Sequence, residues 1–259
     1  MLFAIDIGNS NITLGIFNGE ELIMRWRMAT NKALMPDEYG MQFWFLFEHN
    51  GIDPNQLDGV IISSVVPQIT SKVEEACGYY VKRPVMKVSY KSKLGMNIKI
   101  DYPNELGQDR IVDAIAVKNL YGSPSCLIDF GTATTFNLIN RDGDFIGGTI
   151  TAGIQTSADA LFAKTAQLPN ISIQKPPSII GTNTVNSMQA GLIYGYVAMV
   201  EGMVARFKKI LGDDLYVIAT GGLAKTIASE TNCIQDINSW LTLSGLRLFW
   251  EMNNESMPE

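Results

Sequence analysis

Two stretches of this chain repeat one pattern, and that repeat limits the possible folds more than any other feature. Residues 3–15 read FAIDIGNSNITLG and residues 126–138 read CLIDFGTATTFNL. In each, an apolar run ends in an aspartate, a turn of glycine and small polar residues follows, and a second apolar run begins. The matched positions are Asp6, Gly8, Asn9 and Asn11 in the first stretch and Asp129, Gly131, Thr132 and Thr134 in the second. All four pairs share one offset, 129 − 6 = 123 residues, which predicts a duplicated unit.

The segments around these stretches also come in the same order. In the first half the pattern predicts a three-stranded meander at 2–8, 11–17 and 21–28, with a type I′ turn at Asn18-Gly19. A helix at 37–49, a buried strand at 58–66 and a helix at 67–78 are predicted to follow. A helix at 108–121 closes that half. The second half repeats the meander at 125–131, 134–140 and 145–153, with a hairpin turn at 141–144. A helix from about 154 and a strand at 214–222 are predicted to follow. We therefore expect an α/β fold with domains at 1–122 and 123–259 and a cleft between them.

Composition and charge exclude several classes of function. Of 259 residues, 46% are hydrophobic, the net charge is -6, and no apolar run approaches the length of a membrane span. Nucleic acid and membrane are therefore not expected as partners. The first apolar run stops at Asp6, too short for a signal peptide, and three cysteines without CxxC spacing predict neither disulfides nor zinc, so we expect a cytoplasmic protein. The single histidine, His49, falls at a predicted helix end, so acid–base chemistry must rest on carboxylates.

The repeated turns are typical of a phosphate-binding site that lacks a lysine. Backbone N–H groups and short polar side chains converge in such a turn, where phosphate oxygens can bind. Asp6 and Asp129 would repel that anion, so the pattern requires a cation such as magnesium or a monovalent ion. The alternative is that each aspartate only caps its turn.

With Gly221-Gly222 after a late strand, the paired turns resemble the actin, sugar-kinase and Hsp70 superfamily. That resemblance implies two duplicated ribonuclease-H-like domains, each with a mixed five-stranded sheet, that hold ATP between them. The superfamily contains kinases, ATPases and polymer-forming proteins, so it does not identify the substrate.

A second set of motifs is more specific. The sequence GQDR at 107–110 follows DYPNELG and precedes a helix, and the motifs DIGNSN, IDFGTATT, GGTITAG, TAQLP, GTNT and LTLSGL occur in order along the chain. Together they resemble type III pantothenate kinases over essentially the whole length. One departure is Ala152, where the family commonly has proline; we expect a slightly looser loop and no lost donor.

The resemblance implies phosphorylation of the primary hydroxyl of pantothenate by ATP, the first step of coenzyme A biosynthesis. Asp109 would be the general base, because a carboxylate can orient an alcohol and accept its proton. Arg110 would bind a carboxylate or the transferring charge, or else only pair with Asp113. The implied substrate-binding residues are Tyr102, Gly107, Gln108, Asp109, Arg110 and Thr184.

The resemblance also assigns the nucleotide and its cations. The implied ATP-binding residues are Asp6, Ile7, Gly8, Asn9, Ser10, Asn11, Ile12, Thr13, Thr132, Gly221 and Gly222. Asp6 would hold Mg²⁺ through water and Asp129 would bind K⁺ or NH₄⁺, although the sequence alone does not separate these two roles.

The longest predicted helix, 186–211, carries Gly191, Gly195 and Gly202 on one stripe with two alanines. Glycine is costly inside a helix, so the stripe indicates close contact, either with the sheet of its own domain or with a partner helix. The family is dimeric, with Thr184 reaching the neighbouring subunit's site, so a homodimer is implied. An accessory transcription regulator of the same family without kinase activity is the alternative function.

Overall fold

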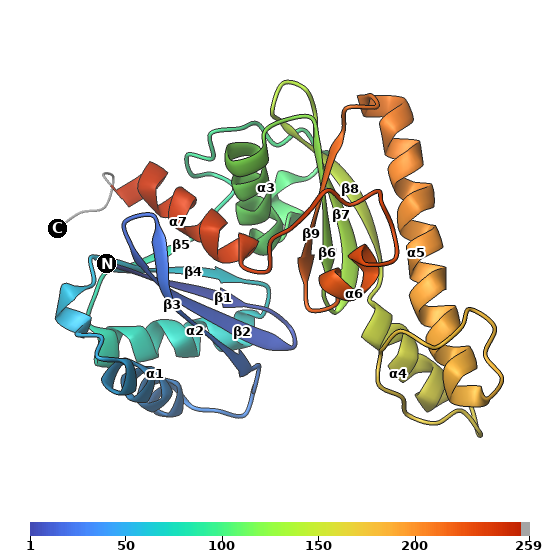
Figure 1. Ribbon diagram of the computed structural model, residues 1–259. Coiled ribbons are helices and arrows are strands. Elements are labelled where there is room, and N and C mark those ends of the chain that lie inside the picture. Colours follow the sequence, from blue (N-terminus) through green and yellow to red (C-terminus); the bar gives the residue numbers. More distant parts are fainter. Residues whose placement is uncertain (255–259) are drawn as a thin grey trace. The chain divides into compact units, whose positions relative to one another are not determined.

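The structure is a computed structural model and describes residues 1–254 (Figure 1). The chain divides into two compact units. The first contains residues 1–95, 101–116 and those from 242 onward, and the second contains residues 96–100 and 117–241. This division differs from the predicted boundary at 122/123 in three segments: 96–100 and 117–122, which belong to the second unit, and the C-terminal helix, which belongs to the first.

The first unit is built on a five-stranded sheet in the order β3-β2-β1-β4-β5. Its strands are β1 (Leu2–Ile7), β2 (Asn11–Asn18), β3 (Glu21–Ala29), β4 (Gly59–Ser64) and β5 (Val85–Lys87). Its helical segments are α1 (Pro36–Asn50), η1 (Pro54–Gln56), α2 (Pro67–Ala76), η2 (Cys77–Val81), η3 (Pro103–Glu105), the start of α3 (Gln108–Tyr121) and nearly all of α7 (Leu241–Asn253). The meander strands are antiparallel, whereas β4 and β5 run parallel to β1.

The second unit repeats this arrangement in the order β8-β7-β6-β9-β10. Its strands are β6 (Ser125–Phe130), β7 (Ala133–Ile139), β8 (Phe145–Ala152), β9 (Tyr216–Gly221) and β10 (Asp236–Ile237). Its helices are α4 (Ile154–Lys164), α5 (Thr184–Leu211) and α6 (Ala224–Ala228). In both sheets the first strand lies between its antiparallel hairpin partner and a parallel fourth strand. The predicted fold class, two duplicated α/β domains each with a mixed five-stranded sheet, is confirmed.

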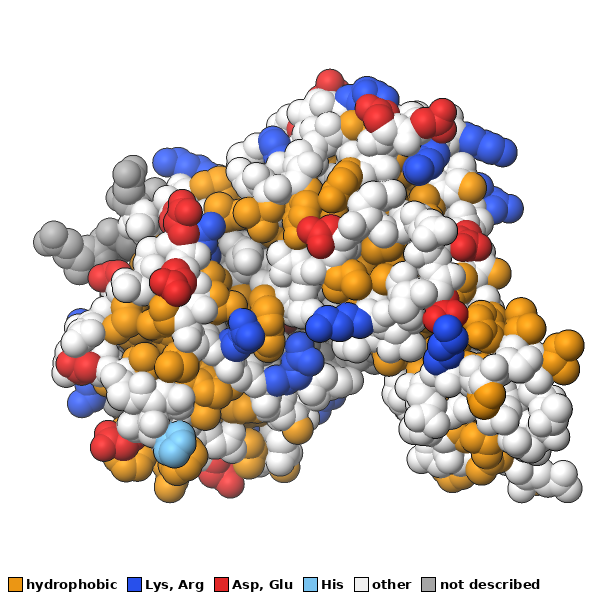
Figure 2. Space-filling model, in the orientation of Figure 1, with side chains coloured by type: hydrophobic (Ala, Val, Ile, Leu, Met, Phe, Trp, Pro, Cys, Tyr) orange, Lys and Arg blue, Asp and Glu red, His pale blue; other side chains and the backbone are white. Residues whose placement is uncertain are grey.

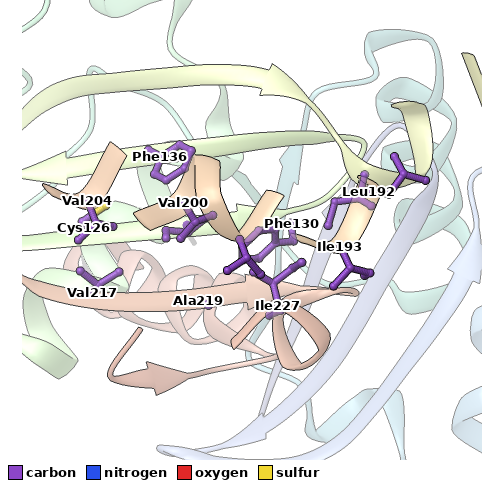
Figure 3. Packing of buried hydrophobic residues seen from close by; sticks show 14 of the residues in the cluster. Cys126, Phe130, Phe136, Leu192, Ile193, Val200, Val204, Val217, Ala219 and Ile227 are labelled. Atoms are coloured by element: carbon purple, nitrogen blue, oxygen red, sulfur yellow. The ribbon is translucent and has the colours of Figure 1, made fainter. Parts of the chain in front are cut away.

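Each unit has its own hydrophobic core. In the second unit, buried side chains of β6 and β9 meet those of α5 and α6, as Figure 3 shows for Phe130, Ala219, Val200 and Ile227. In the first unit, Phe3 of β1 packs edge-on against Phe43 and Phe47 of α1. Two separate cores explain why each half can form a compact unit.

The C-terminal helix belongs to the first unit because glycine and tryptophan allow close packing there. A Cβ atom on Gly245 of α7 would lie 2.0 Å from the carbonyl oxygen of Val112 in α3, and Trp250 covers Gly59 so closely that a Cβ there would lie 2.1 Å from the ring. The sequence had assigned no helix to this segment.

One local prediction was wrong, and one of the two interpretations of the glycine stripe does not hold for Gly191 and Gly195. The first hairpin turn is Gly19-Glu20, since Asn18 still pairs with Glu21, and of these residues only Gly19 has a positive φ, so the turn is not type I′. The glycine stripe of α5 does not pack on the sheet of its own unit: Gly191 and Gly195 are exposed, and a Cβ on either would meet nothing within 4 Å.

Two further features are the position of the single histidine and the apolar character of the helices. His49 lies in the last turn of α1, is exposed, and stacks on Phe45 at a centroid distance of 5.8 Å (Figure 2). Among the described residues, no helix is long and apolar enough to cross a membrane.

Segment 96–100 is held in the second unit by Asp144, a buried carboxylate in the β7–β8 hairpin. Asp144 Oδ1 accepts hydrogen bonds from the backbone N–H and the side-chain amide of Asn97 at 3.0 and 2.9 Å. Lys99 Nζ lies 2.8 Å from Asp144 Oδ2. The bond from Lys99 and the bonds from Asn97 lower the pKa of Asp144 from its ordinary 3.8 to about 2.

Asp144→Asn is expected to lower the free energy of unfolding at neutral pH. A carboxylate whose pKa is depressed in the folded state stabilises the fold above its unfolded pKa and loses that contribution as pH falls through its folded pKa. The stability difference between wild type and variant should therefore shrink between pH 4 and pH 2, measured by urea unfolding. Asp142→Asn is the control, because Asp142 is exposed and lies 3.9 Å from the same lysine. An equal effect of both substitutions would contradict this account of Asp144.

Candidate active site

The first repeated turn connects β1 to β2 and carries the predicted nucleotide residues of the first unit. Asp6 lies one residue before the end of β1, opposite Thr13 of β2 and beside Ser63 of β4. The turn closes through a hydrogen bond from Gly8 N–H to the Asn11 carbonyl at 3.0 Å. Asn9, Ser10 and Asn11 are exposed there, while Ile7 and Ile12 point into the core. The polar part of the motif therefore forms the surface, and its apolar part anchors it.

The second turn connects β6 to β7 and is one residue shorter than the first. Asp129 lies opposite Thr135 of β7 and beside Thr220 of β9, and Gly131 N–H donates to the Ala133 carbonyl at 3.0 Å. Asn11 therefore corresponds to Ala133, and the predicted match of Asn11 to Thr134 was wrong.

Side-chain exposure in the second turn agrees with this corrected register. Thr134 is fully buried, whereas Thr132 is exposed in the turn. Thr132, not Thr134, is the threonine whose side chain lies at the surface of the turn.

Gly221 ends β9 beside Phe130 and lies against Asp129. Its φ of +92° favours glycine, and a Cβ there would be 2.6 Å from Asp129 Oδ1. Gly222 follows and is exposed. The structure thus brings Asp129 and Gly221, predicted separately as cation and nucleotide residues, into contact.

Asp109 lies in the first turn of α3, in the GQDR motif. Its Oδ1 accepts a hydrogen bond from Arg110 N–H at 2.7 Å. A Cβ atom on Gly107 would lie only 2.5 Å from this oxygen, so the glycine leaves room for the carboxylate. The backbone N–H of Asp109 itself also bonds to the carboxylate, and no side chain within residues 1–254 does so. The carboxylate is therefore held by backbone groups alone, and no side chain competes with a substrate for it.

The environment of Asp109 makes it more basic. Burial raises the pKa of Asp109, and this outweighs the hydrogen bond from Arg110 N–H and the charge of Arg110, which lower it. A raised pKa increases the proton affinity of a carboxylate that acts as a base.

Gln108 connects the motif to the sheet. Its Oε1 accepts a hydrogen bond from Ser64 N–H at 2.9 Å, at the end of β4. Ser64 is the register partner of Ile7 on β1, the residue that follows Asp6. The start of α3 is therefore attached at the same edge of the sheet as the first turn.

Arg110 is influenced by both neighbouring carboxylates. Burial lowers the pKa of its guanidinium, while the charges of Asp109 and then Asp113 raise it. Asp113 is only 3% exposed. Both interpretations of Arg110, a substrate contact or a partner for Asp113, are compatible with this arrangement.

Two predicted substrate residues lie at the surface. Tyr102 is 65% exposed and precedes η3 in the first unit. Thr184 is exposed at the start of α5 in the second unit, next to Asn183, whose side chain caps the helix by accepting from Asn186 N–H at 2.9 Å.

Sequence reasoning missed the residues that hydrogen-bond to the carbonyl groups of the two turns. Thr30 hydrogen-bonds to the first turn, and Gly153 and Thr156 hydrogen-bond to the second. Thr30 and Gly153 each directly follow the third strand of their sheet, a shared position that the repeat could have revealed.

No group of three or more His, Cys, Asp or Glu side chains that could hold a metal occurs within residues 1–254. A cation at either turn would be bound by one aspartate, with its remaining ligands from backbone, water or phosphate oxygens. Oxygen ligands of this kind suit Mg²⁺, which usually retains several waters.

Comparisons with known proteins agree on one family. A model of the type III pantothenate kinase family matches residues 2–206. A type III pantothenate kinase from Bacillus cytotoxicus is 48% identical over 253 residues, which cover 98% of this chain and 97% of that protein.

Two solved structures share the fold at low sequence identity. A conserved protein of the Baf family of transcriptional activators from Campylobacter jejuni aligns with a TM-score of 0.61 at 16% identity, covering 98% of this chain and 99% of that one. The activator of 2-hydroxyisocaproyl-CoA dehydratase from Clostridium difficile, with bound ADPNP, aligns with a TM-score of 0.54 at 13% identity, covering 100% and 98%. The family model and the close relative together show that the chain belongs to the type III pantothenate kinase family.

Proposed function

We propose that this protein transfers the γ-phosphoryl group of ATP to the primary hydroxyl of pantothenate, giving 4′-phosphopantothenate in the first step of coenzyme A biosynthesis. Family membership supports the substrate. The observation that carries the chemistry is the carboxylate of Asp109, with Oδ1 fixed by Arg110 N–H and no side chain of the described residues bonded to the carboxylate.

In this proposal Asp109 is the general base. Its Oδ2 accepts the proton of the substrate hydroxyl as the hydroxyl oxygen attacks the γ-phosphorus. The bond from the γ-phosphorus to the bridging oxygen breaks, and ADP leaves. Phosphoryl transfer demands mainly positioning and charge stabilisation, so a fixed carboxylate beside the nucleophile is a suitable arrangement.

The neighbouring residues are proposed to bind pantothenate. With its Oε1 held by Ser64 N–H, the Gln108 amide has Nε2 as a donor with no partner among residues 1–254. Arg110 supplies a positive charge for the carboxylate of the substrate. Tyr102, Gly107 and Thr184 complete the proposed set.

The two turns are proposed to bind ATP and its cations. Asp6 would hold Mg²⁺ through water, with the polar residues of the first turn on the phosphates. Thr132 would contact a phosphate, Gly221 and Gly222 the nucleoside, and Asp129 a K⁺ or NH₄⁺ ion. The support is that each aspartate lies directly before an exposed polar turn of matching construction.

We also propose a cytoplasmic homodimer. Large apolar side chains flank Thr184: Ile179 is 66% exposed, Ile180 76% and Val185 40%. The exposed glycines Gly191 and Gly195 of α5 continue this surface on the next turns of the helix. Small residues permit close approach of a partner helix, so these features favour a second subunit over the sheet of the same unit.

An ATP-consumption assay with K⁺ or Na⁺ as the only monovalent cation tests the proposal. We expect pantothenate-dependent turnover that is faster in K⁺. Asp129→Asn should lower kcat/KM in K⁺ on the order of tenfold, since a contact to a charged group contributes about 1.5 kcal/mol or more, and should remove the difference between the cations.

The outcomes separate the parts of the proposal. Absence of pantothenate-dependent turnover in K⁺ would refute the kinase and favour an accessory transcription regulator. Equal turnover in K⁺ and Na⁺ would refute only the role of Asp129.

A further inference from the structure

We propose that Thr30 is a positioning residue that fixes the direction of the backbone N–H groups in the first turn. The inference rests on the proposed binding of ATP phosphates by that turn. Thr30 would act through the carbonyls of Gly8 and Ser10 and need not touch the nucleotide itself.

Thr30 makes two hydrogen bonds to the turn. It directly follows β3, and its Oγ1 donates to the Gly8 carbonyl at 2.7 Å. Its backbone N–H donates to the Ser10 carbonyl at 3.0 Å. One residue thus holds two carbonyls, on either side of Asn9, in a turn whose outer side chains are exposed.

Because peptide groups are planar, holding a carbonyl in place also fixes the direction of the N–H group of the next residue. In a trans peptide, the C=O of one residue and the N–H of the next point in opposite directions. Holding the Gly8 and Ser10 carbonyls toward Thr30 therefore turns the N–H groups of Asn9 and Asn11 away from it. Asn9 is exposed, and its N–H has no hydrogen-bond partner within residues 1–254. An N–H group held in this way is a suitable donor to a phosphate oxygen.

Thr30 is itself held by the helices of the first unit. The segment that follows it is bound by Tyr39 Oη, which donates to the Asn31 carbonyl at 2.8 Å. Lys72 Nζ donates to the carbonyls of Lys32 and Leu34 at 2.9 and 2.8 Å. The support for the turn therefore extends to α1 and α2, and does not end at a free loop.

The second unit repeats the backbone part of this arrangement with different residues. Gly153 directly follows the third strand, and its N–H donates to the Thr132 carbonyl at 3.0 Å. Thr132 corresponds to Ser10, because Ala133 corresponds to Asn11. Thr156 adds the hydroxyl, which donates to the same carbonyl at 2.7 Å. The backbone bond therefore recurs at equivalent carbonyls, those of Ser10 and Thr132, which favours a role in holding each turn. The hydroxyl bonds go to different positions, the Gly8 carbonyl in the first turn and the Thr132 carbonyl in the second.

Thr30→Val and Thr30→Ser test the proposal. Valine removes the hydroxyl and keeps the shape and the N–H, whereas serine keeps the hydroxyl. We expect Thr30→Val to raise the Kd for Mg-ATP and the KM for ATP about five- to tenfold, the usual worth of one lost hydrogen bond. The KM for pantothenate should change less than about twofold, and Thr30→Ser should bind ATP within about twofold of wild type.

Thr231→Val is the matched control. Thr231 is also half-buried, and its Oγ1 donates to Glu201 Oε1 at 2.8 Å, outside both turns. It should leave ATP binding unchanged. If Thr30→Val does not fold, Thr30→Ala gives the same comparison without the added methyl group.

Calorimetric titration of Mg-ATP without pantothenate separates this inference from the proposed function. If the wild type binds Mg-ATP and Thr30→Val binds it with equal affinity, the role of Thr30 alone is overturned. The same holds if Thr30→Ser loses as much affinity for Mg-ATP as Thr30→Val. No binding of Mg-ATP by the wild type would overturn the nucleotide site and the role of Thr30 with it.

Discussion

Asp109→Asn is expected to lower kcat about 10²-fold or more while leaving Mg-ATP binding unchanged, because general-base catalysis typically contributes 10²- to 10⁴-fold. Asparagine has nearly the shape of aspartate and can still accept from Arg110 N–H through its Oδ1. The fold around the GQDR motif should therefore remain, and the loss should appear in kcat and not in melting temperature. Single-turnover kinetics with saturating ATP and pantothenate measure it directly.

The pH dependence gives a second measure of the same residue. Burial raises the pKa of Asp109, so the base becomes protonated, and turnover falls, at a higher pH than for an ordinary aspartate at 3.8. The acid limb of the kcat profile should therefore lie above pH 3.8 and should be absent in Asp109→Asn.

Asp101→Asn is the control, since Asp101 is exposed in the segment before η3. It should retain both the rate and the acid limb. An Asp109→Asn enzyme with near-wild-type kcat would show that another group is the base.

The meander, helix and strand of each half could be predicted because each segment is long enough for its hydrophobic pattern to be detected. β5 and β10 could not, since strands of three and two residues are too short to show alternation. α7 escaped detection because Gly245 interrupts its apolar pattern. The structure gives the reason for that glycine, which is the backbone of Val112 at the contact.

The positions of the candidate residues were predictable where these residues lie next to each other in the sequence. Asp6, Asp129 and the GQDR residues belong to compact motifs, and the structure puts Asp129 beside Gly221 as strand order requires. The constant offset of 123 residues failed beyond the second turn because a one-residue deletion inside a repeat cannot be seen when small polar residues fill both turns.

The supports of the turns could not be predicted from local patterns. Thr30 lies about twenty residues beyond the turn that it holds, and its role depends on β3 returning beside β2. In the second half Gly153 provides only the N–H, and the hydroxyl comes from Thr156 on the following helix. Both halves bond the equivalent carbonyl, that of Ser10 or Thr132, but through different residue types, so a match of letters between the repeats does not reveal these bonds.

Gly153→Ala is expected to displace the second turn, although Gly153 itself lies outside it. A Cβ at this position would lie 2.3 Å from the Gly131 carbonyl oxygen and 2.5 Å from that of Thr132. Both atoms are backbone, so the turn itself must move. The φ of Gly153 is -70°, which alanine adopts readily, so the cost is steric and not conformational.

This displacement should be visible in both stability and activity. Overpacking of this kind costs about 1–3 kcal/mol of unfolding free energy. If the second turn binds a phosphate of ATP through Thr132, kcat/KM for ATP should fall on the order of 10- to 100-fold. Gly78→Ala is the control, because Gly78 is exposed in η2 and a Cβ there meets nothing within 4 Å. A Gly153→Ala enzyme that is destabilised but keeps its kcat/KM for ATP would show that the second turn supports the fold without serving the nucleotide.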